Sequence, residues 1–600
     1  MKKTRLTMAQ ALVKYLTVQH VEMDNGKVLP YFGGCWAIFG HGNVAGLGEA
    51  LYHAQDKLPT FRAHNEQSMA HAAIGFGKAT KRQRAMIATS SIGPGATNMV
   101  TAAALAHSNR LPILLLPGDT FARRTPDPVL QQIEDFSDPN VTANDCFKPV
   151  SRFFDRIYRP EQLISSLPQA IAVLRDPAEC GPVTLALPQD VQAEAFDYPE
   201  SFFEPITHRL FRAEPDRNEL AAAVALLKTA KKPLIIAGGG VHYSLAFDAL
   251  KSFAEKHGIP VCETQAGKGA IDHTLSLGGL GVTGSDAANR MMAEADVVVA
   301  VGTRLSDFTT ASRTTMNHAK FISLNAGRFD AGKHHGLPLR ADTRQGLLAL
   351  SAALGDWKAG AQDTKFTAEW QKRSAELCAA TDELPSDAQV VGAVARGGNE
   401  KVTVVAAAGS FPAELQRHWP ASAPDGYHVE YGYSCMGYEI AGAIGAKMAL
   451  PERDVIVFVG DGSYLMANSE IATSVALKQK LIIIVCDNRG FGCINRLQKG
   501  TGNAPFNNLL EDAHPKIDFA AHAAAMGAAS EKVNSISELE AALKRAKAAD
   551  KTYVIALDTT PHVSTSGLCW WDVGVPETSP RKEVVEAHKT FNQHRPKQPY

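Results

Sequence analysis

Two oxygen-bearing side chains stand at the ends of two apolar runs in the last third of the chain. Asp461 follows the run VIVFVG, and Asn488 follows the run LIIIVCD, 27 residues after Asp461. Such runs indicate buried strands, and the spacing of apolar residues between them indicates a helix. In an open parallel sheet the carboxyl ends of neighbouring strands border the ligand crevice. Carboxylate and amide oxygens suit Mg²⁺, which usually takes few protein ligands together with phosphate oxygens.

The turn between the first of these strands and the helix has the sequence Gly460-Asp461-Gly462. Its glycines allow a tight turn and a close approach of the backbone to a ligand. A helix that starts at Ser463 would present free N–H groups to the same anion. The residues therefore predict a metal-bridged diphosphate site. The alternative is a turn aspartate and a strand-end asparagine that only cap the backbone.

The composition is that of a soluble globular protein with more than one core. The chain has 600 residues, of which 45% are hydrophobic and 20% are charged, and this length predicts three or four domains. Its net charge is −1 and no basic stripe stands out, so we expect no nucleic-acid partner.

The cysteines and the N-terminus both favour a cytoplasmic location. Nine cysteines are scattered without CxxC pairs, which argues for a reducing compartment and against structural zinc. The segment after MKKTR contains Gln10 and Lys14 and is predicted as an amphipathic helix over residues 7–17 rather than a signal peptide. No apolar run approaches the ~20 residues of a membrane-spanning helix, so we expect no membrane partner.

Helix and strand signals alternate along most of the chain, which predicts parallel βαβ units. The expected fold class is α/β, with three doubly wound parallel-sheet domains. The glycine run Gly238-Gly239-Gly240 follows an apolar strand but is not a GxGxxG motif, which disfavours a dinucleotide oxidoreductase and favours a structural middle domain. The expected domains are 1–192, 208–355 and 385–575, followed by a tail over 576–600 that is either an ordered surface arm or partly disordered.

The Gly-Asp-Gly turn, with an asparagine after the next apolar strand, resembles the cofactor motif of the thiamine diphosphate (ThDP) and magnesium-dependent enzymes. The order of three α/β domains, with this motif in the third, is similar to the same family over roughly residues 7–575. The resemblance implies that the first domain binds the aminopyrimidine ring and the third binds the diphosphate. It also implies a homodimer or homotetramer with active sites at the subunit interface.

The segment AHNEQSMAHAAIGFGKAT (63–80) resembles the part of the first domain that carries the family's cofactor-activating glutamate. The resemblance implies that the carboxyl group of Glu66 hydrogen-bonds the ring nitrogen N1′ of the aminopyrimidine. Considered alone, Glu66 is equally a glutamate near a helix N-terminus, stabilised there by the helix dipole.

Further cofactor contacts come from the third domain. The turn from Gly409 through Ser410 to Phe411 could hold the terminal phosphate through N–H groups and a hydroxyl, with a plain N-cap at Ser410 as the alternative. The segment YGYSCMGYEIAGAIGA (431–446) resembles the family's wedge segment. That resemblance implies that Met436 supports the bent cofactor and that the Ser434 carbonyl accepts from its amino group.

The metal ligands implied by position are Asp461, Asn488 and the main-chain carbonyl of Gly490, with Gly462 and Ser463 beside the diphosphate. The family usually has Asn-Asn at the end of the second strand, whereas this chain has Asp487-Asn488. Asp487 is therefore an alternative ligand.

Four longer stretches narrow the resemblance to one group of ThDP enzymes, the trihydroxycyclohexane-1,2-dione hydrolases of inositol catabolism. They are FGHGNVAGLGEAL (39–51), HNEQ (64–67), the block 127–152 and CWWDVGVPE (569–577). The resemblance implies hydrolytic C–C cleavage that opens the ring of 3D-(3,5/4)-trihydroxycyclohexane-1,2-dione to 5-deoxy-D-glucuronate. The alternatives are an acetolactate synthase-type carboligase acting on 2-oxo acids and a catalytically silent ThDP-fold protein.

Ring opening needs an acid–base group that transfers a proton to or from water. His41, in the glycine-rich loop after the first strand, is our hypothesis for it, against a structural loop histidine. A polyhydroxylated substrate also needs polar groups in its pocket. The candidates for these are Asn43, Gln131, Gln132 and Lys148.

Overall fold

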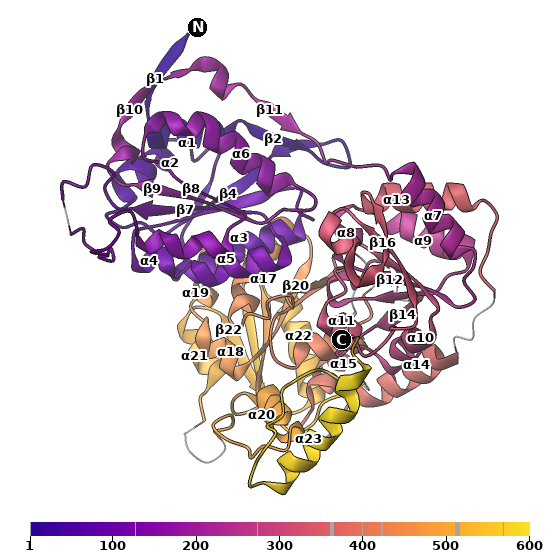
Figure 1. Ribbon diagram of the computed structural model, residues 1–600. Coiled ribbons are helices and arrows are strands. Elements are labelled where there is room, and N and C mark those ends of the chain that lie inside the picture. The colour runs from indigo at the N-terminus through magenta and orange to yellow at the C-terminus, as the bar shows by residue number, and fades with distance from the viewer. Residues whose placement is uncertain are drawn as a thin grey trace. The chain divides into compact units, whose positions relative to one another are not determined.

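The structure is a computed structural model (Figure 1). It describes residues 2–126, 128–272, 274–360, 365–398, 400–421, 424–510, 516–567 and 569–599.

Contacts between residues divide the chain into two compact units, each α/β in class, as expected. The bounds of the three domains and of the tail that were inferred from the sequence stay predictions. The first unit comprises Met1–Phe211, Gly432–Pro451 and Ala467–Gln479, and the second comprises Arg212–Tyr431, Glu452–Met466 and Lys480–Tyr600.

A six-stranded sheet forms the centre of the first unit, in the order β5-β4-β6-β7-β9-β8. All its strand pairs are parallel. The two central strands and β9 are buried along their whole length, as expected for a parallel sheet covered on both faces. The strands are β4 (Phe32–Ala37), β5 (Thr60–Phe61), β6 (Ala85–Ser90), β7 (Ile113–Asp119), β8 (Phe153–Arg156) and β9 (Pro182–Pro188).

Helices cover both faces of this sheet (Figure 1). On one face lie α1 (Met8–Thr17), which confirms the first predicted helix, and α6 (Leu163–Arg175). On the other lie α3 (Glu66–Ala79) and α5 (Val100–Asn109). Short strands complete the unit, with β1 (Lys3–Thr7) antiparallel to β10 (Ala195–Pro199).

Helix α17 (Tyr438–Ala449) packs against α3 at backbone distance, within the first unit. A Cβ atom added to Gly75 would lie 2.2 Å from the carbonyl oxygen of Gly442. A Cβ atom added to Gly445 would lie 1.9 Å from the carbonyl oxygen of Ala72. Real Cβ contacts are never this short, so only glycine permits this crossing. The helix that begins at Glu66 is thereby fixed to the segment that carries Met436.

The second unit contains two more six-stranded parallel sheets. The first has the order β14-β13-β12-β15-β16-β17, which is the 3-2-1-4-5-6 order of dinucleotide-binding folds. Its strands are β12 (Pro233–Ala237), β13 (Val261–Glu263), β14 (Ser276–Gly279), β15 (Val297–Val301), β16 (Lys320–Asn325) and β17 (Leu337–Arg340).

The run Gly238-Gly239-Gly240 follows β12 of this sheet and leads into the short helix α8 (Gly239–Tyr243). A Cβ atom added to Gly240 would lie 2.6 Å from the Cα atom of Gly302, and the Gly240 N–H donates to the Gly302 carbonyl at 2.9 Å. These glycines therefore serve close packing between the ends of two strands.

The other sheet of the second unit has the order β19-β18-β20-β21-β23-β22. If the strands of each sheet are numbered in chain order, this sheet and the sheet of the first unit have the same strand order. All its pairs are parallel. The strands are β18 (Val402–Ala406), β19 (Tyr427–Val429), β20 (Asp454–Gly460), β21 (Ile482–Asp487), β22 (Ala529–Val533) and β23 (Tyr553–Asp558).

The helix predicted between β20 and β21 is in fact two short helices, α18 (Asp461–Met466) and α19 (Glu470–Ala476). The break falls at Ala467-Asn468-Ser469, where asparagine and serine favour helix ends over helix interiors. The Asn468 carbonyl accepts from the N–H of Ile471 at 3.0 Å and so opens the second helix.

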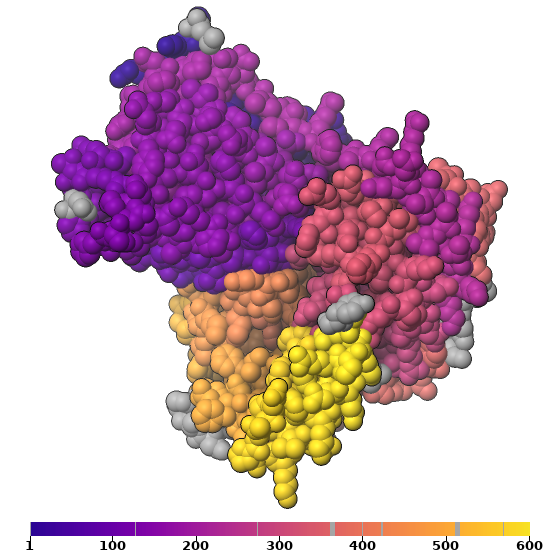
Figure 2. Space-filling view, in the orientation of Figure 1, coloured from indigo at the N-terminus to yellow at the C-terminus, as the bar shows by residue number. Residues whose placement is uncertain are grey.

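The tail after residue 576 contains helix α23 (Lys582–His594), which lies on the surface of the second unit (Figure 2). The CWWDVGVPE segment connects this tail to the sheet of β12–β17. The Trp570 ring stacks on His594, and the Trp571 N–H donates to Asp307 at 3.1 Å. This part of the resemblance to the dione hydrolases therefore has a structural role in fixing the tail.

Two further properties concern the cysteines and the length of the apolar helices. All nine cysteines are free. Among the described residues, none of the helices combines the length and the apolar composition needed to span a bilayer.

Candidate cofactor site

The sheet of β18–β23 reverses its strand order between β18 and β20, and ligands of open α/β sheets bind at such a switch point. The Gly409-Ser410 turn follows β18, and Asp461 follows β20. A Cβ atom added to Gly409, whose φ is +78°, or to Gly460 would meet no described atom within 4 Å. There is thus open space beside both turns, where a diphosphate could lie.

Asp461 is a buried carboxylate whose charge is incompletely satisfied. Gly460 pairs with Cys486 across the two strands, which brings Asp461 close to Asp487. Burial raises the pKa of Asp461 to about 7, the charge of Asp487 adds to this, and hydrogen bonds from the backbone of Asn488 and Gly490 oppose it. Its Oδ1 atom is buried and has no hydrogen-bond partner among the described residues. A divalent cation would satisfy this oxygen and offset the repulsion.

The loop after β21 has a backbone that suits a carbonyl ligand. Gly490 has φ +138°, and a Cβ atom there would lie 2.3 Å from the Asn508 carbonyl oxygen, so only glycine fits. Asn488 is buried, and its Oδ1 atom receives only a long contact of 3.4 Å from the N–H of Gly492. The alternative ligand, Asp487, already accepts from the N–H of Arg489 at 2.9 Å.

Within the described parts of the chain, no cluster of three or more His, Cys, Asp or Glu side chains could hold a metal. A metal at this switch point would therefore need amide and carbonyl oxygens beside a carboxylate. The predicted set of Asp461, Asn488 and the Gly490 carbonyl has this composition. It is also the oxygen-only set that Mg²⁺ prefers.

Helix α16 (Phe411–His418) starts at the other side of the switch point. Ser410 occupies its N-cap position, but its side chain makes no capping hydrogen bond. The hydroxyl instead accepts from the guanidinium group of Arg496. The simple N-cap alternative for Ser410 is therefore not what the structure shows. Arg496 was not found by sequence reasoning because it lies 86 residues further along the chain.

Glu66 is the first residue of α3, and Asn65 caps that helix by accepting from the N–H of Ser68 at 3.1 Å. The Oε2 atom of Glu66 accepts from the side-chain amide of Asn98 at 3.0 Å. Its Oε1 atom lies 3.1 Å from a Cβ atom added to Gly95. The segments 63–80 and 90–103 thus meet at this carboxyl group. Asn98 was not among the site residues expected from the sequence.

The wedge segment lies in the same unit as Glu66. Ser434 has φ +54°, a left-handed conformation that is rare for serine. Such strained residues concentrate at ligand sites. Met436 is half-buried. Beside it, His71 of α3 is fully buried and makes an edge-to-face contact with Tyr438 of α17, with 5.4 Å between ring centroids.

His41 is exposed in the turn that follows β4. Asn43 holds this loop, because its side chain accepts from the N–H of Gly40 at 3.0 Å and donates to Thr89 at 3.1 Å. Asn43 is buried, and its place among the substrate-pocket candidates stays a prediction. His41 has no hydrogen bond to the described residues and stays the acid–base hypothesis.

Three family models match the chain in succession. They are the N-terminal TPP binding domain of thiamine pyrophosphate enzymes over residues 35–138, their central domain over 220–350 and their C-terminal TPP binding domain over 407–557. The chain is 45% identical to the 3D-(3,5/4)-trihydroxycyclohexane-1,2-dione hydrolase of Geobacillus thermodenitrificans, and 98% of each chain is covered. The chain belongs to the thiamine pyrophosphate enzyme family.

Other relatives carry the same name. The chain is 44% identical to the proteins so named from Bacillus cereus and Bacillus thuringiensis, again with 98% of each chain covered. The three matched domains agree with the three parallel sheets. They also place Asp461 and Asn488 in the C-terminal TPP binding domain, and Glu66 in the N-terminal one.

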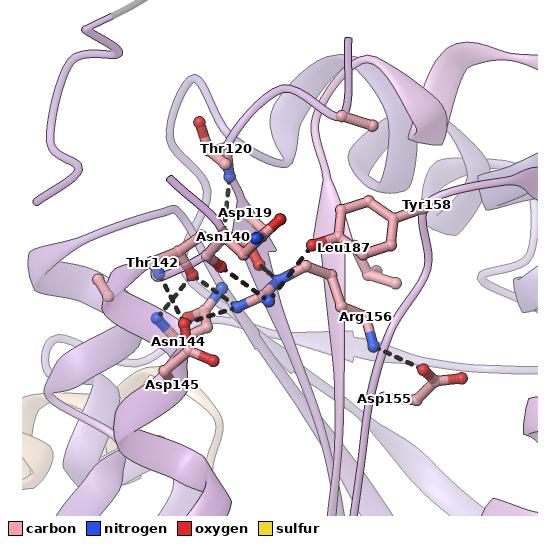
Figure 3. A network of polar contacts seen from close by, with 12 residues as sticks. Asp119, Thr120, Asn140, Thr142, Asn144, Asp145, Asp155, Arg156, Tyr158 and Leu187 are labelled. Atoms are coloured by element: carbon pink, nitrogen blue, oxygen red, sulfur yellow. Dashed lines mark hydrogen bonds and ion pairs between the residues drawn. The ribbon is translucent and has the colours of Figure 1, made fainter. Parts of the chain in front are cut away.

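The segment of this thiamine pyrophosphate enzyme that follows β7 is held by a buried polar network (Figure 3). Arg156, at the end of β8, donates through Nε to Asp119 at 2.6 Å and through Nη2 to Asp145 at 3.1 Å. Nη2 also donates to the Thr142 hydroxyl at 2.9 Å. One guanidinium group therefore fixes part of the block 127–152, in which Lys148 pairs with Asp145 at 2.7 Å.

Replacing Arg156 by Met should destabilise the first unit by about 3–5 kcal/mol, because Asp119 would remain buried without its ion-pair partner. Arg156 and Asp119 are 7% and 0% exposed. The control is Arg159→Met, which removes a surface ion pair with Glu161 and should cost at most about 1 kcal/mol. Urea unfolding measures both, and equal losses would show that the buried pair contributes nothing specific.

His71 should make stability depend on pH. Burial lowers the pKa of His71 to about 4, against a weaker opposing effect of the Gly437 backbone. The unfolded state therefore binds more protons between about pH 4 and pH 6.5, and stability falls as the pH decreases through this range. The expected loss is about 2 kcal/mol between pH 7.5 and pH 5.

The variant His71→Gln removes this titration, so its unfolding free energy should fall less over the same range. Urea unfolding at several pH values, with the wild type in parallel, gives the difference directly. Parallel curves for the two proteins would mean that His71 does not titrate as its burial implies.

Proposed function

We propose that this enzyme opens the ring of 3D-(3,5/4)-trihydroxycyclohexane-1,2-dione by hydrolytic C–C cleavage to 5-deoxy-D-glucuronate, in myo-inositol catabolism, with ThDP and Mg²⁺ as cofactors. The observation that carries the proposal is the identity of 44–45% to dione hydrolases over 98% of the chain. The residues of the switch point support the cofactors, because they offer oxygen ligands, a helix start and open space.

ThDP, when bound, supplies a carbon nucleophile and an electron sink. The residues of the chain bind and orient the cofactor and the substrate, and they transfer protons. Asp461, Asn488 and the Gly490 carbonyl would hold Mg²⁺, with Gly462 and Ser463 beside the diphosphate. Gly409, Ser410 and Phe411 would border the terminal phosphate.

The other cofactor contacts belong to the first unit. Glu66 would hold a proton at N1′ of the aminopyrimidine ring, with Asn98 keeping its carboxyl group in place at 3.0 Å. Ser434 would accept from the amino group of that ring through its carbonyl. Met436 would support the bend between the cofactor's two rings.

His41 is the proposed group that moves a proton to or from water during cleavage. Replacing it by Ala should lower kcat by about 100-fold, the usual size of an acid–base contribution, without changing ThDP affinity. The control is His53→Ala, since His53 is an exposed histidine at the end of a short helix, where it pairs with Glu49 and contacts the ring of Tyr52. Unchanged turnover in His41→Ala would eliminate this role.

We also propose a homodimer or homotetramer in the cytoplasm, with active sites at the subunit interface. Leu465 and Met466 support this, because these large apolar side chains are exposed on α18, only a few residues after Asp461. Exposed apolar side chains beside a site are typical of surfaces that a partner covers. An active monomer in light scattering would contradict the assembly.

The decisive experiment compares two substrates with the same purified protein. The cyclic dione should be consumed only when ThDP and Mg²⁺ are both present, with formation of the carboxylate product. Pyruvate should not be consumed. Release of CO₂ from pyruvate would favour an acetolactate synthase-type carboligase instead, and loss of neither substrate with bound ThDP would favour a silent member of the family.

A further inference from the structure

Arg496 carries a positive charge to the switch point between β18 and β20. It lies on α20 (Gly492–Gly500), the helix that directly follows the Asn488 and Gly490 loop. Its guanidinium group donates through Nη1 to the Pro561 carbonyl at 2.5 Å and through Nη2 to the Ser410 hydroxyl. The side chain is thus held in one direction, against the start of α16.

Arg496 forms no direct ion pair within the described residues, although the buried carboxyl group of Asp387 is close enough to interact with its charge. Its hydrogen bonds there are the two contacts above, and the thiol of Cys493 on the same helix is also within reach of the guanidinium group. A guanidinium group has five N–H donors in a planar fork, so these contacts leave donors for another acceptor. An arginine side chain that is half-buried, held in one direction and left with unused N–H donors suits a phosphate group.

The Ser410 hydroxyl is one of the groups that hold the guanidinium group of Arg496. It accepts from Arg496, and the buried carboxyl group of Asp387 lies close enough to interact with both. Asp387 is 4% exposed, and its Oδ1 atom has no hydrogen-bond partner in the described chain. The contact with Arg496 uses an acceptor position of the hydroxyl, and this contact directs the guanidinium group.

The surroundings leave room for an anion beside Arg496. A Cβ atom added to Gly409 would meet nothing within 4 Å. The backbone N–H groups of Ser410 and Phe411 donate to no acceptor in the described structure. These features agree with a phosphate that receives backbone N–H groups on one side and the arginine fork on the other.

We infer that Arg496 is the side chain that binds the terminal phosphate of the diphosphate cofactor, and that Ser410 and Asp387 position its guanidinium group. Ser410 is thereby a positioning residue, because its hydroxyl accepts from the guanidinium group. The inference rests on the proposed ThDP dependence. It adds that selection of diphosphate over monophosphate depends on α20.

The test measures the affinities of thiamine, thiamine monophosphate and ThDP, in saturating Mg²⁺, by isothermal titration calorimetry. In Arg496→Gln the ThDP affinity should fall by about 10- to 100-fold, the range for hydrogen bonds to a charged group. Thiamine affinity should stay within about twofold, because thiamine has no phosphate. The preference for ThDP over thiamine monophosphate should shrink accordingly.

Three further variants make the result specific. Arg496→Lys keeps the charge without the fork and should lose an intermediate factor. Ser410→Ala should lose less than Arg496→Gln, because the guanidinium group keeps its Pro561 contact. The matched control is Lys499→Gln, which removes a positive charge from an exposed position of the same helix and should bind all three compounds like the wild type.

Two outcomes would overturn the inference while leaving the cofactor assignment intact. One is an Arg496→Gln protein that binds ThDP like the wild type. The other is an equal loss for thiamine, thiamine monophosphate and ThDP, which would mean that Arg496 only supports the fold. A wild-type protein that fails to bind ThDP would instead overturn the proposed function itself, and this inference with it.

Discussion

Glu66→Gln should lower kcat for the ThDP-dependent reaction by about 10²- to 10⁴-fold, the usual range for a positioned acid–base group. Glutamine has nearly the same shape and keeps an oxygen for the 3.0 Å contact with Asn98. It cannot give or take the proton that a carboxyl group would share with N1′ of the aminopyrimidine. The first unit should therefore stay folded and lose its ability to activate the cofactor.

The readout of this variant should separate activation from binding. Hydrogen–deuterium exchange at C2 of bound ThDP should slow along with kcat, whereas the Kd for ThDP should change much less. The control is Glu583→Gln, the same substitution in the first turn of α23, where the side chain is exposed. A normal rate of C2 exchange in Glu66→Gln would remove Glu66 from the mechanism.

Asp461→Asn should have opposite effects on the apo protein and on cofactor binding. Without cofactor, the wild-type carboxylate is buried beside Asp487, and its pKa is raised to about 7. A folded-state pKa above the unfolded value costs stability as the pH rises from about 4 to 7. At pH 8 the neutral asparagine should therefore stabilise the apo protein, by about 2–4 kcal/mol.

The same variant should lose the metal. Asparagine lacks the negative charge that Mg²⁺ requires beside two neutral oxygens, so addition of ThDP and Mg²⁺ should no longer raise the Tm, and turnover should fall by at least about 1,000-fold. Differential scanning calorimetry measures both effects. Asp487→Asn is the paired variant, because it also relieves the repulsion but should keep a Tm increase on addition of cofactor. If Asp487→Asn loses the increase and Asp461→Asn keeps it, the metal ligand is Asp487.

Much of the architecture follows from local sequence. Continuous apolar runs such as PVTLALP identify buried parallel strands, because both faces of such a sheet are covered. The closeness of Asp461 and Asn488 follows from the same pattern, since neighbouring parallel strands end at the same edge. Glu66 and Met436 needed the family resemblance, because neither a helix-start glutamate nor a loop methionine identifies a cofactor site by itself.

The features that the sequence did not predict depend on contacts between distant segments. Asn98 reaches Glu66 across 32 residues, and Arg496 reaches Ser410 across 86. No local pattern marks such a pair. The break between α18 and α19 was missed for a different reason, since Asn468 and Ser469 interrupt a helical pattern whose apolar spacing continues on both sides.

The close crossing of α3 and α17 has a consequence for mutational libraries. Gly75, Gly442 and Gly445 have no space for even one methyl group, although none is a proposed ligand of cofactor or substrate. In a random library selected for the ThDP-dependent activity, these three positions should tolerate substitution as poorly as Glu66 or Asp461. A survey that assigns every position intolerant of substitution to the active site would therefore include glycines that only permit the close crossing of two helices.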